Sequence, residues 1–193
     1  MARSRLHPIA LFVSVAAGAL LLAGCTTTPS AAPAANVLAA HGLDGLDGRE
    51  LIERLDTLPV AERPNDLLAS VRPDAVVVSD PDGFETSVPL PADEFYVSIA
   101  PYATRTHDCY FHSLTTCLGE LRDEPIRVRV TDPADGAVLV DRTTRTYDNG
   151  FIGLWLPKGI DADLLVESGG RSGRTTIGTG ADDPTCVTTL ALV

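Results

Sequence analysis

The sequence is poor in positive charge and in methionine. Its 193 residues include 15 lysines and arginines against 26 aspartates and glutamates, which gives a formal net charge of −11. A protein this acidic is not expected to bind nucleic acid or an anionic membrane surface. Met1 is the only methionine, so removal of an N-terminal leader would leave none. A metal site built from thioether sulfur is therefore excluded.

The sequence also lacks an apolar run long enough for a comfortable transmembrane helix. The longest, Ile9–Leu22, falls short of the roughly 20 apolar residues that such a helix needs. It follows two arginines and ends in the letters LAGC at Leu22–Cys25. These features are typical of a signal peptide, and the LAGC ending is typical of bacterial lipoproteins. We therefore predict a signal peptide over 1–24 and lipidation of Cys25; the alternative is an ordinary cleavable signal that happens to contain a cysteine.

Lipidation determines where the protein is expected to reside. Burial of acyl chains contributes about 0.8 kcal/mol per methylene, so two or more chains such as palmitate anchor a protein stably, whereas one does not. We expect a lipid-anchored protein of the cell membrane, extracytoplasmic in the periplasm or on the outer face. Residues 25–35 are rich in small residues and proline, which predicts a flexible tether.

The segment after the tether has helical periodicity. Apolar residues recur at helical spacing up to residue 58, behind Asp44 or Asp47 as a helix cap. A second short helix is predicted over 65–71. Pro73 should stop it, because the residue before a proline disfavours helical backbone.

Beyond Pro73 the pattern changes to short strands separated by Asp, Gly and Pro turn signals. The clearest is Ile126–Val130 (IRVRV), where apolar residues alternate with arginines. We predict strands over 75–79, 84–88, 94–100, 126–131, 137–143, 151–156, 164–167, 174–179 and 185–190. The predicted fold is mainly β (α+β overall): a small N-terminal α/β region over 36–90 that carries the helices, then an antiparallel β-sandwich or barrel-like domain over 91–193.

The number of cysteines limits how they can pair. With Cys25 assigned to the lipid, three cysteines remain, at Cys109, Cys117 and Cys186. An odd number in an oxidising compartment leaves at least one thiol that cannot pair within the chain. The spacing matches neither the C-x-x-C of a thioredoxin-like site nor the paired short spacing of a structural zinc site.

Two of these cysteines share the segment 106–117 (THDCYFHSLTTC) with His107 and His112. In an extended segment His107 and Cys109 would share a face. A hairpin would set Cys109 opposite Cys117, with β-carbons roughly 5 Å apart. A helical turn would instead bring Cys109 beside His112. The threonine and aromatic content favours the extended form.

The residues leave three interpretations of the cysteines open. The first is a structural disulfide, worth roughly 2.5 kcal/mol within the segment or about 4.4 kcal/mol from either cysteine to Cys186 in the chain-entropy model. Each such bond leaves one thiol over. The second is a metal site in which three thiolates converge on a soft ion. The third is a redox pair with a resolving cysteine.

The cysteine segment also carries a family resemblance. SIAPYATRTHDCYFHSLTTCLGEL closely resembles the signature of the CueP family of periplasmic copper-binding proteins. The resemblance continues through TYDNGFIGLWLPKGI and TCVTTLAL. Upstream, DGRELIERLDTLPVAERPNDLLASVRPDAVVVSD is similar to the family's N-terminal region, so the resemblance covers about His41–Val193.

This resemblance implies a function and a site. The family binds copper in the cell envelope and contributes to copper tolerance through three cysteines and neighbouring histidines. The matching positions here are Cys109, Cys117, Cys186, His107 and His112. The resemblance further implies a small N-terminal domain, a larger β-rich domain and a homodimer. The lipobox departs from the family pattern and predicts a tethered protein rather than a freely diffusing one.

Ligand chemistry agrees with the resemblance. Copper(I) is soft and prefers thiolates at low coordination number, whereas zinc prefers four ligands and could compete if a histidine joined the cysteines. We therefore predict an envelope copper(I)-binding lipoprotein, not an enzyme, that sequesters copper or delivers it to a copper-accepting protein. The alternatives are a thiol–disulfide protein that reduces copper(II), with a thiol reductase as partner, and a structural β-sandwich with one disulfide.

Overall fold

The computed structural model describes residues 33–193, with side chains from residue 37 onward. The predicted signal peptide, the lipidation site at Cys25 and most of the predicted tether lie outside the described residues. The first helix, α1 (Pro33–Ala40), begins within the range predicted as tether. The described residues form one compact unit, and the division of this unit at residue 90 stays a prediction. None of the helices in the described range is long and apolar enough to cross a membrane.

Helix α2 (Gly48–Asp56) starts at a capping box. The Asp47 side chain accepts a hydrogen bond from the Glu50 backbone amide, and the Glu50 side chain accepts one from the Asp47 amide. Its apolar side chains are buried, as the helical periodicity predicts. Its last residue, Asp56, is also fully buried, and this brings a carboxylate into the interior.

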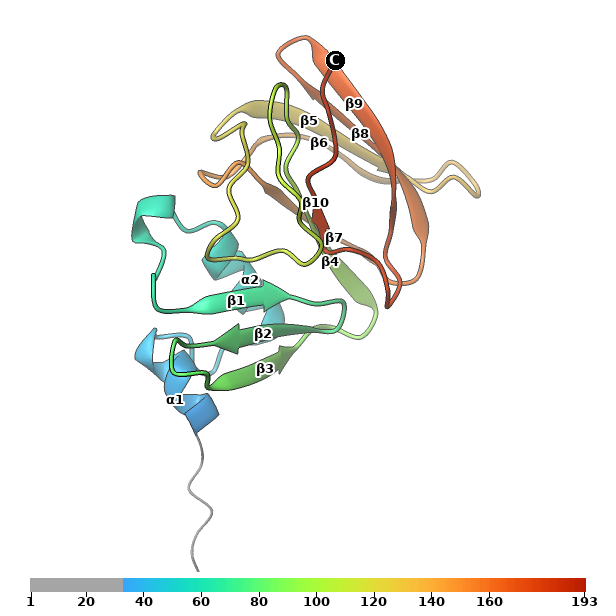
Figure 1. Cartoon of the computed structure of the whole chain (residues 1–193). Coiled ribbons are helices and arrows are strands. Elements are labelled where there is room, and N and C mark those ends of the chain that lie inside the picture. Colours follow the sequence, from blue (N-terminus) through green and yellow to red (C-terminus); the bar gives the residue numbers. More distant parts are fainter. Residues whose placement is uncertain (1–32) are drawn as a thin grey trace, which may run out of the picture. The chain divides into compact units, whose positions relative to one another are not determined.

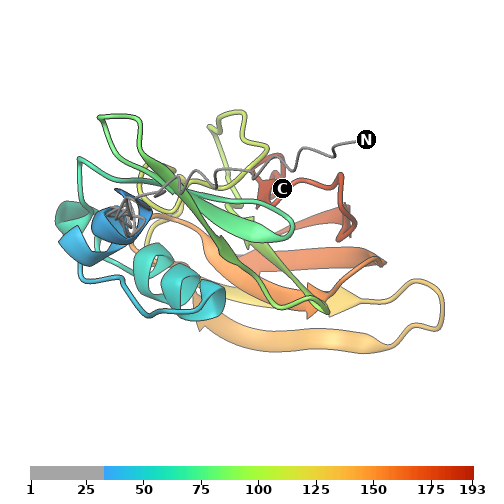
Figure 2. The same ribbon diagram turned by 90° about the horizontal axis from the view of Figure 1, so that it is seen from below.

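A three-stranded antiparallel sheet follows the short 3-10 helix η1 (Val60–Glu62), in the order β1 (Leu68–Val71), β2 (Ala75–Ser79) and β3 (Glu85–Pro89). Helices α1 and α2 lie together on one side of it (Figure 2). The helix predicted over 65–71 is wrong, because Ala69 and Val71 are buried in alternation and β1 pairs with β2 along its whole length.

The remaining strands confirm the predicted mainly β fold. They are β4 (Glu94–Ile99), β5 (Pro125–Thr131), β6 (Val138–Arg145), β7 (Ile152–Pro157), β8 (Asp161–Ser168), β9 (Arg171–Gly178) and β10 (Cys186–Val187). They form one sheet in the order β10-β4-β7 and another in the order β6-β5-β8-β9 (Figure 1). Pairing is antiparallel except for β10, which runs parallel to β4.

Strand β4 faces two hydrophobic cores. Phe95, Val97 and Ile99 belong to the core of the β5–β9 region. Tyr96, on the opposite face, packs into the core formed by the helices and β1–β3. Ser98 shares that face and is fully buried. The polar groups of β4 therefore point toward α2.

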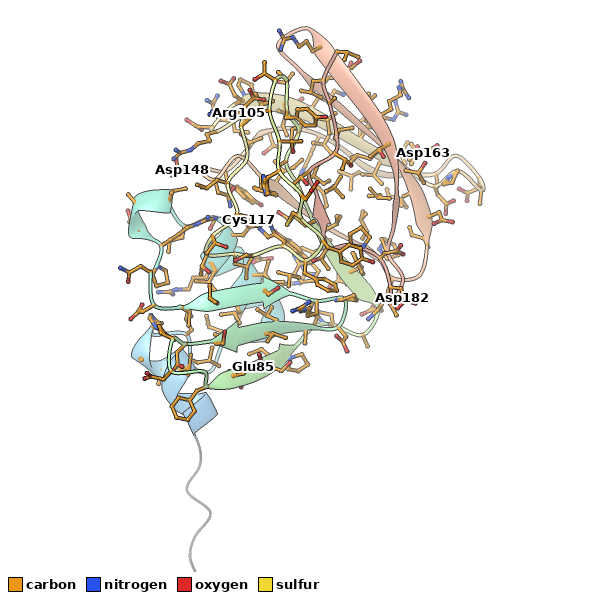
Figure 3. The ribbon with its side chains drawn as sticks, in the orientation of Figure 1. Glu85, Arg105, Cys117, Asp148, Asp163 and Asp182 are labelled. Atoms are coloured by element: carbon orange, nitrogen blue, oxygen red, sulfur yellow. A yellow bond between two sulfur atoms is a disulfide. The ribbon has the colours of Figure 1, made fainter. Side chains whose placement is uncertain are left out.

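The segment between β4 and β5 carries most of the predicted site residues. The hairpin, one of the geometries left open for 106–117, does not form; backbone groups of the segment bond to neighbouring strands instead. The backbone amide of Val71 donates to the His112 carbonyl at 2.8 Å, and the amide of Cys186 donates to the Tyr110 carbonyl at 3.1 Å. The segment therefore lies between β1 and β10, with Cys117 above β1 in Figure 3.

Candidate metal centre

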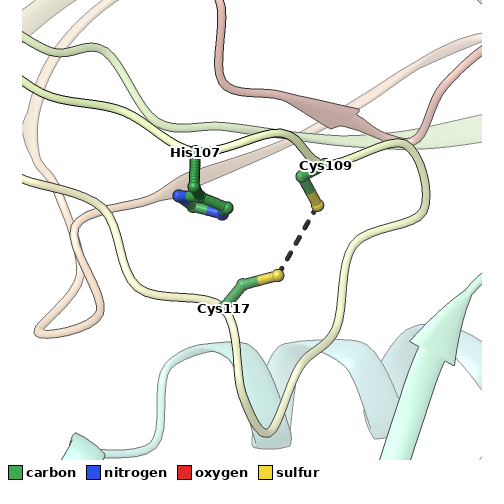
Figure 4. A group of neighbouring side chains, drawn as sticks. All are labelled: His107, Cys109 and Cys117. Atoms are coloured by element: carbon green, nitrogen blue, oxygen red, sulfur yellow. Dashed lines mark hydrogen bonds between the residues drawn. The ribbon is translucent and has the colours of Figure 1, made fainter.

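The three cysteines of the described chain meet at one point. Cys109 and Cys186 form a disulfide with a Cα–Cα distance of 5.7 Å, although 77 residues separate them in the sequence. The Sγ atom of Cys117 lies 3.6 Å from that of Cys109 (Figure 4). Strand β10 and the segment after β4 thus bring together all three predicted sulfur atoms.

The two predicted histidines occupy different positions beside these sulfurs. Exposed His107 has a ring nitrogen within 4.8 Å of the Cys109 and Cys117 sulfurs, and buried His112 has one within 4.8 Å of the Cys117 and Cys186 sulfurs. The structure therefore holds an outer and an inner group of potential metal ligands. They share Cys117, which is partly exposed.

The His112 ring is fixed on three sides. Its Nδ1 atom lies 3.8 Å from Cys186 Sγ, and its Nε2 atom lies 2.9 Å from Asp56 Oδ1. The Phe151 ring packs against it with the ring centroids 4.5 Å apart. Neither His112 nor Asp56 is exposed to solvent. The ring consequently presents one nitrogen to the sulfurs and the other to a carboxylate.

Asp56 is surrounded by hydrogen-bond donors. Its Oδ2 atom accepts from the Tyr96 hydroxyl at 2.5 Å and the Ser98 hydroxyl at 3.2 Å. Its Oδ1 atom accepts from Asn149 Nδ2 at 2.8 Å in addition to the His112 contact. Burial alone would raise the pKa of Asp56, but His112 and these hydrogen bonds lower it below the usual value. The carboxylate therefore stays ionised inside the protein.

The same pairing controls the charge of the histidine and the nearby thiol. Burial alone would lower the pKa of His112, but the Asp56 carboxylate raises it to about 9. Burial alone would raise the pKa of the Cys117 thiol, but His112 and the Ser113 backbone amide lower it below its usual value. Cys117 is thus predisposed to be a thiolate, the form in which cysteine binds metals.

The position of Cys117 is set by its own backbone as well. Its amide donates to the Ser113 carbonyl at 3.1 Å, and the Ser113 amide donates back to Cys117 Sγ at 3.3 Å. The Arg63 guanidinium donates to the Cys117 carbonyl at 2.8 Å. These contacts close a tight turn that holds the thiol toward the disulfide.

This set of donors fits a soft metal cation. Sulfur from three cysteines and a neutral imidazole nitrogen are ligands that copper(I) accepts readily, and zinc can use the same atoms. A site with all three thiolates requires reduction of the Cys109–Cys186 disulfide, because a disulfide sulfur is a poor ligand compared with a thiolate. The described geometry is therefore that of an oxidised pair beside one remaining thiol.

Two residues of this centre escape prediction from sequence patterns. One sequence feature could have indicated that Asp56 is unusual. It is an acid at the C-terminal end of a predicted helix, where the helix dipole disfavours negative charge. Asn149 lies in the segment TYDNG, which resembles the family signature, but nothing in its spacing indicates contact with a helix near residue 56.

Comparisons with known proteins agree with this geometry. A family model described as periplasmic copper-binding protein CueP matches residues 50–191. A solved structure, described as the crystal structure of S.CueP, is 38% identical, has a TM-score of 0.77, and covers 82% of this chain and 96% of its own. No curated protein sequence matches the chain significantly. The resemblance predicted from the cysteine segment is confirmed, and with it an extracytoplasmic location. The chain belongs to the CueP family of periplasmic copper-binding proteins.

Proposed function

We propose that this protein binds copper(I) through Cys109, Cys117 and Cys186 and thereby sequesters copper or delivers it in the cell envelope. The observation that carries the proposal is the convergence of three sulfurs from distant segments. Cys117 Sγ lies 3.6 Å from Cys109 Sγ, and Cys117 belongs to both groups of potential ligands. Copper(I) favours such a set because it is soft and accepts low coordination numbers.

His112 is the better candidate for a nitrogen ligand than His107. It is fully buried, its ring is fixed, and its Nδ1 atom lies 3.8 Å from a cysteine sulfur. His107 is exposed and is suited to contact copper as it enters or leaves. Zinc would compete for three cysteines plus His112, because this completes the four ligands that zinc prefers.

Binding would be coupled to the redox state of the cysteines. Reduction of the Cys109–Cys186 disulfide takes two electrons and two protons from an external thiol reductant and yields two thiols. Copper(I) then binds as the thiols lose their protons, so affinity should fall as pH falls. A thiol reductase is accordingly a proposed partner, besides a copper-accepting protein.

A second candidate function has its own supporting observation. Cys117 Sγ lies close to the disulfide, and the low pKa of the Cys117 thiol favours attack on Cys109 Sγ. That exchange would form a Cys109–Cys117 bond and release Cys186 as thiolate. Starting from the reduced form, two thiolates could instead give one electron each to two copper(II) ions, producing two copper(I) ions and a disulfide. A reduced protein that converts copper(II) stoichiometrically would support this alternative.

A titration with copper(I) under anaerobic conditions, against a strong chelator, tests the copper proposal. Reduced wild type should compete for one copper ion per site, and Cys109→Ser, Cys117→Ser and Cys186→Ser should each bind much more weakly. The control is Cys25→Ser, which removes a sulfur outside the site. Wild-type affinity in all three site variants would show that copper binds elsewhere. A third interpretation, a purely structural disulfide, predicts no copper(I) binding by any of these proteins.

The lipid anchor is a separate proposal. The LAGC sequence at Leu22–Cys25 supports it, and the experiment is fractionation of cells that express wild type or Cys25→Ser. Wild type should remain with membranes and dissolve only in detergent, and mass spectrometry should find acyl chains on Cys25. A wild type released as readily as the variant would contradict the anchor. Sedimentation of the detergent-solubilised protein then tests the proposed homodimer.

A further inference from the structure

Asp56 lies at the centre of a buried polar group whose parts come from distant segments. It is the last residue of α2. Its contacts are Tyr96 and Ser98 of β4, His112 of the cysteine segment and Asn149 of the turn before β7. Among the hydrogen-bond partners of Asp56 in the described part of the chain, His112 is the only proposed metal ligand. The proposed copper site therefore reaches helix α2 through one imidazole ring.

A buried carboxylate is costly unless it is paired and hydrogen-bonded. Tyr96, Ser98 and Asn149 are neutral donors that an uncharged side chain could also satisfy. His112 is the one contact that can carry a complementary charge, at 2.9 Å. A purely structural link between α2 and β4 thus does not require an oxygen directed at the His112 ring, whereas orientation of that ring does.

The contact also determines which nitrogen of His112 faces the sulfurs. With Nε2 directed at Asp56 Oδ1, Nδ1 is the atom left for Cys117 and Cys186. A flip of the ring would break the carboxylate contact. It would also place the Cδ2–H group where Nδ1 lies beside Cys186, and this carbon offers no lone pair to a metal.

We propose that Asp56 is a positioning residue for the copper site: it holds the Nε2–H of His112, so that Nδ1 faces the sulfurs and binds copper once it has given up its proton. This inference rests on the proposed copper(I) function and adds α2 to the site. Carboxylates that orient ligating histidines typically contribute 10- to 100-fold in metal affinity. We expect a loss of about that size in Asp56→Ala.

Two other variants separate positioning from stability. Asp56→Asn keeps an oxygen for His112 Nε2–H and can turn its amide toward the Tyr96 and Ser98 hydroxyls, which accept as well as donate. It should recover most of the affinity that Asp56→Ala loses. Tyr96→Phe removes a hydrogen bond on the other oxygen of the same carboxylate. It should lower the free energy of unfolding while changing the copper(I) affinity no more than about twofold.

A spectroscopic measurement tests the orientation in the wild type without any variant. Copper(I) is diamagnetic, so nitrogen-15 spectra of the imidazole can be recorded for the reduced protein with and without copper(I). His112 should keep a proton on Nε2 in both states, and Nδ1 should lose its proton and show the larger shift as copper binds. A copper-bound Nε2, or an Nε2 without its proton, would overturn the proposal even if Asp56→Ala failed to fold.

A double-mutant cycle completes the test. If Asp56 acts through His112, adding Asp56→Ala to His112→Ala should cause no further loss of copper(I) affinity. Additive losses, or an Asp56→Ala protein that folds and binds within threefold of wild type, would contradict the inference while leaving the three-cysteine site intact. Failure of the proposed function looks different: the wild type itself would not bind copper(I), and the proton on Nε2 would still be measurable.

Discussion

The Sγ atom of Cys117 lies 3.6 Å from the Sγ atom of Cys109, which is bonded to Cys186. The thiol that remains in the oxidised protein is thus already at the place where a three-sulfur site would form. Opening one disulfide would provide the other two ligands without moving a distant segment. The redox state of one bond can therefore control whether the site exists.

The first prediction concerns this control. Protein with the disulfide intact should bind copper(I) more weakly than reduced protein, by roughly tenfold or more, because two of three thiolates are missing. Alkylation after denaturation, followed by mass spectrometry, should find Cys117 as the only reactive site cysteine in the oxidised protein and all three in the reduced protein. Equal copper affinity in the two forms would argue against a three-thiolate site.

The second prediction is a pH dependence of stability in the metal-free protein. The pKa of His112 rises from 6.5 to about 9 on folding. Because the folded-state pKa is the higher one, protonated His112 stabilises the folded protein. This stabilisation is complete below pH 6.5 and is lost as the pH rises through about 9. The pKa of Asp56 is lowered from 3.8, so ionised Asp56 stabilises the folded protein above pH 3.8. This stabilisation is lost as the pH falls below that value.

Denaturant unfolding at a series of pH values checks this expectation. The free energy of unfolding should fall between pH 6.5 and 9 in wild type. The fall should be largely absent in His112→Asn, which lacks the titrating ring. The Cys117 thiol, whose pKa is lowered on folding, acts in the opposite direction over the same interval. Stability that rises over this interval in Cys117→Ser as well as in wild type would show that His112 is not held in its charged form by Asp56.

The third prediction concerns Gly153 on β7, opposite Ser98 of β4. A Cβ atom at this position would overlap the Tyr96 hydroxyl, which donates to Asp56. Gly153→Ala should therefore displace Tyr96 and destabilise the protein by about 1–3 kcal/mol, as overpacking typically does. Thermal or denaturant unfolding measures the effect, with Thr143→Ala on the exposed face of β6 as control. A Gly153→Ala protein as stable as the control would mean that Tyr96 has room to move.

The fourth prediction concerns Glu120, which organises the start of the cysteine segment. Its carboxylate accepts hydrogen bonds from the backbone amides of Ala103, Thr104 and Arg105, and from the Thr104 hydroxyl. The Thr104 hydroxyl and these amides lower the pKa of Glu120 from 4.5 to about 2.

These contacts should persist above pH 4.5 and weaken as the pH falls through about 2, because the folded-state pKa is the lower one. In Glu120→Gln the Thr104 amide should exchange its hydrogen faster, since the charge that strengthens these bonds is lost. Hydrogen exchange followed by NMR measures this change. Unchanged exchange at Thr104 would contradict the role given to Glu120.

Much of the architecture could be predicted because strand patterns are local. The alternation of apolar residues and arginines in IRVRV, and the turn residues between the apolar segments, predict the boundaries of β5 and its neighbours to within a few residues. The helix predicted over 65–71 failed, because a strand that pairs along its whole length with β2 outweighs the intrinsic helix propensity of a few residues. The hairpin considered for 106–117 does not form for a related reason: backbone groups of this segment bond to β1 and β10, which no local pattern reveals.

The centre itself was predictable in composition but not in arrangement. The odd number of thiols, the segment THDCYFHSLTTC and the distant TCVTTL predicted which cysteines and histidines to consider as ligands. They did not determine that Cys109 pairs with Cys186, or that His112 rather than His107 is buried, because both depend on how β10 lies beside β4. Asp56 enters only through the tertiary contact between α2 and the cysteine segment.

X-ray absorption at the copper edge tests the central claim most directly. The measurement uses reduced, copper(I)-loaded protein, with wild type and Cys117→Ser compared under the same conditions. We predict that sulfur atoms dominate the first coordination shell in wild type, with three contributing, and that the number falls in Cys117→Ser. A first shell of nitrogen and oxygen, or a sulfur count that the substitution leaves unchanged, would contradict copper(I) binding by Cys109, Cys117 and Cys186.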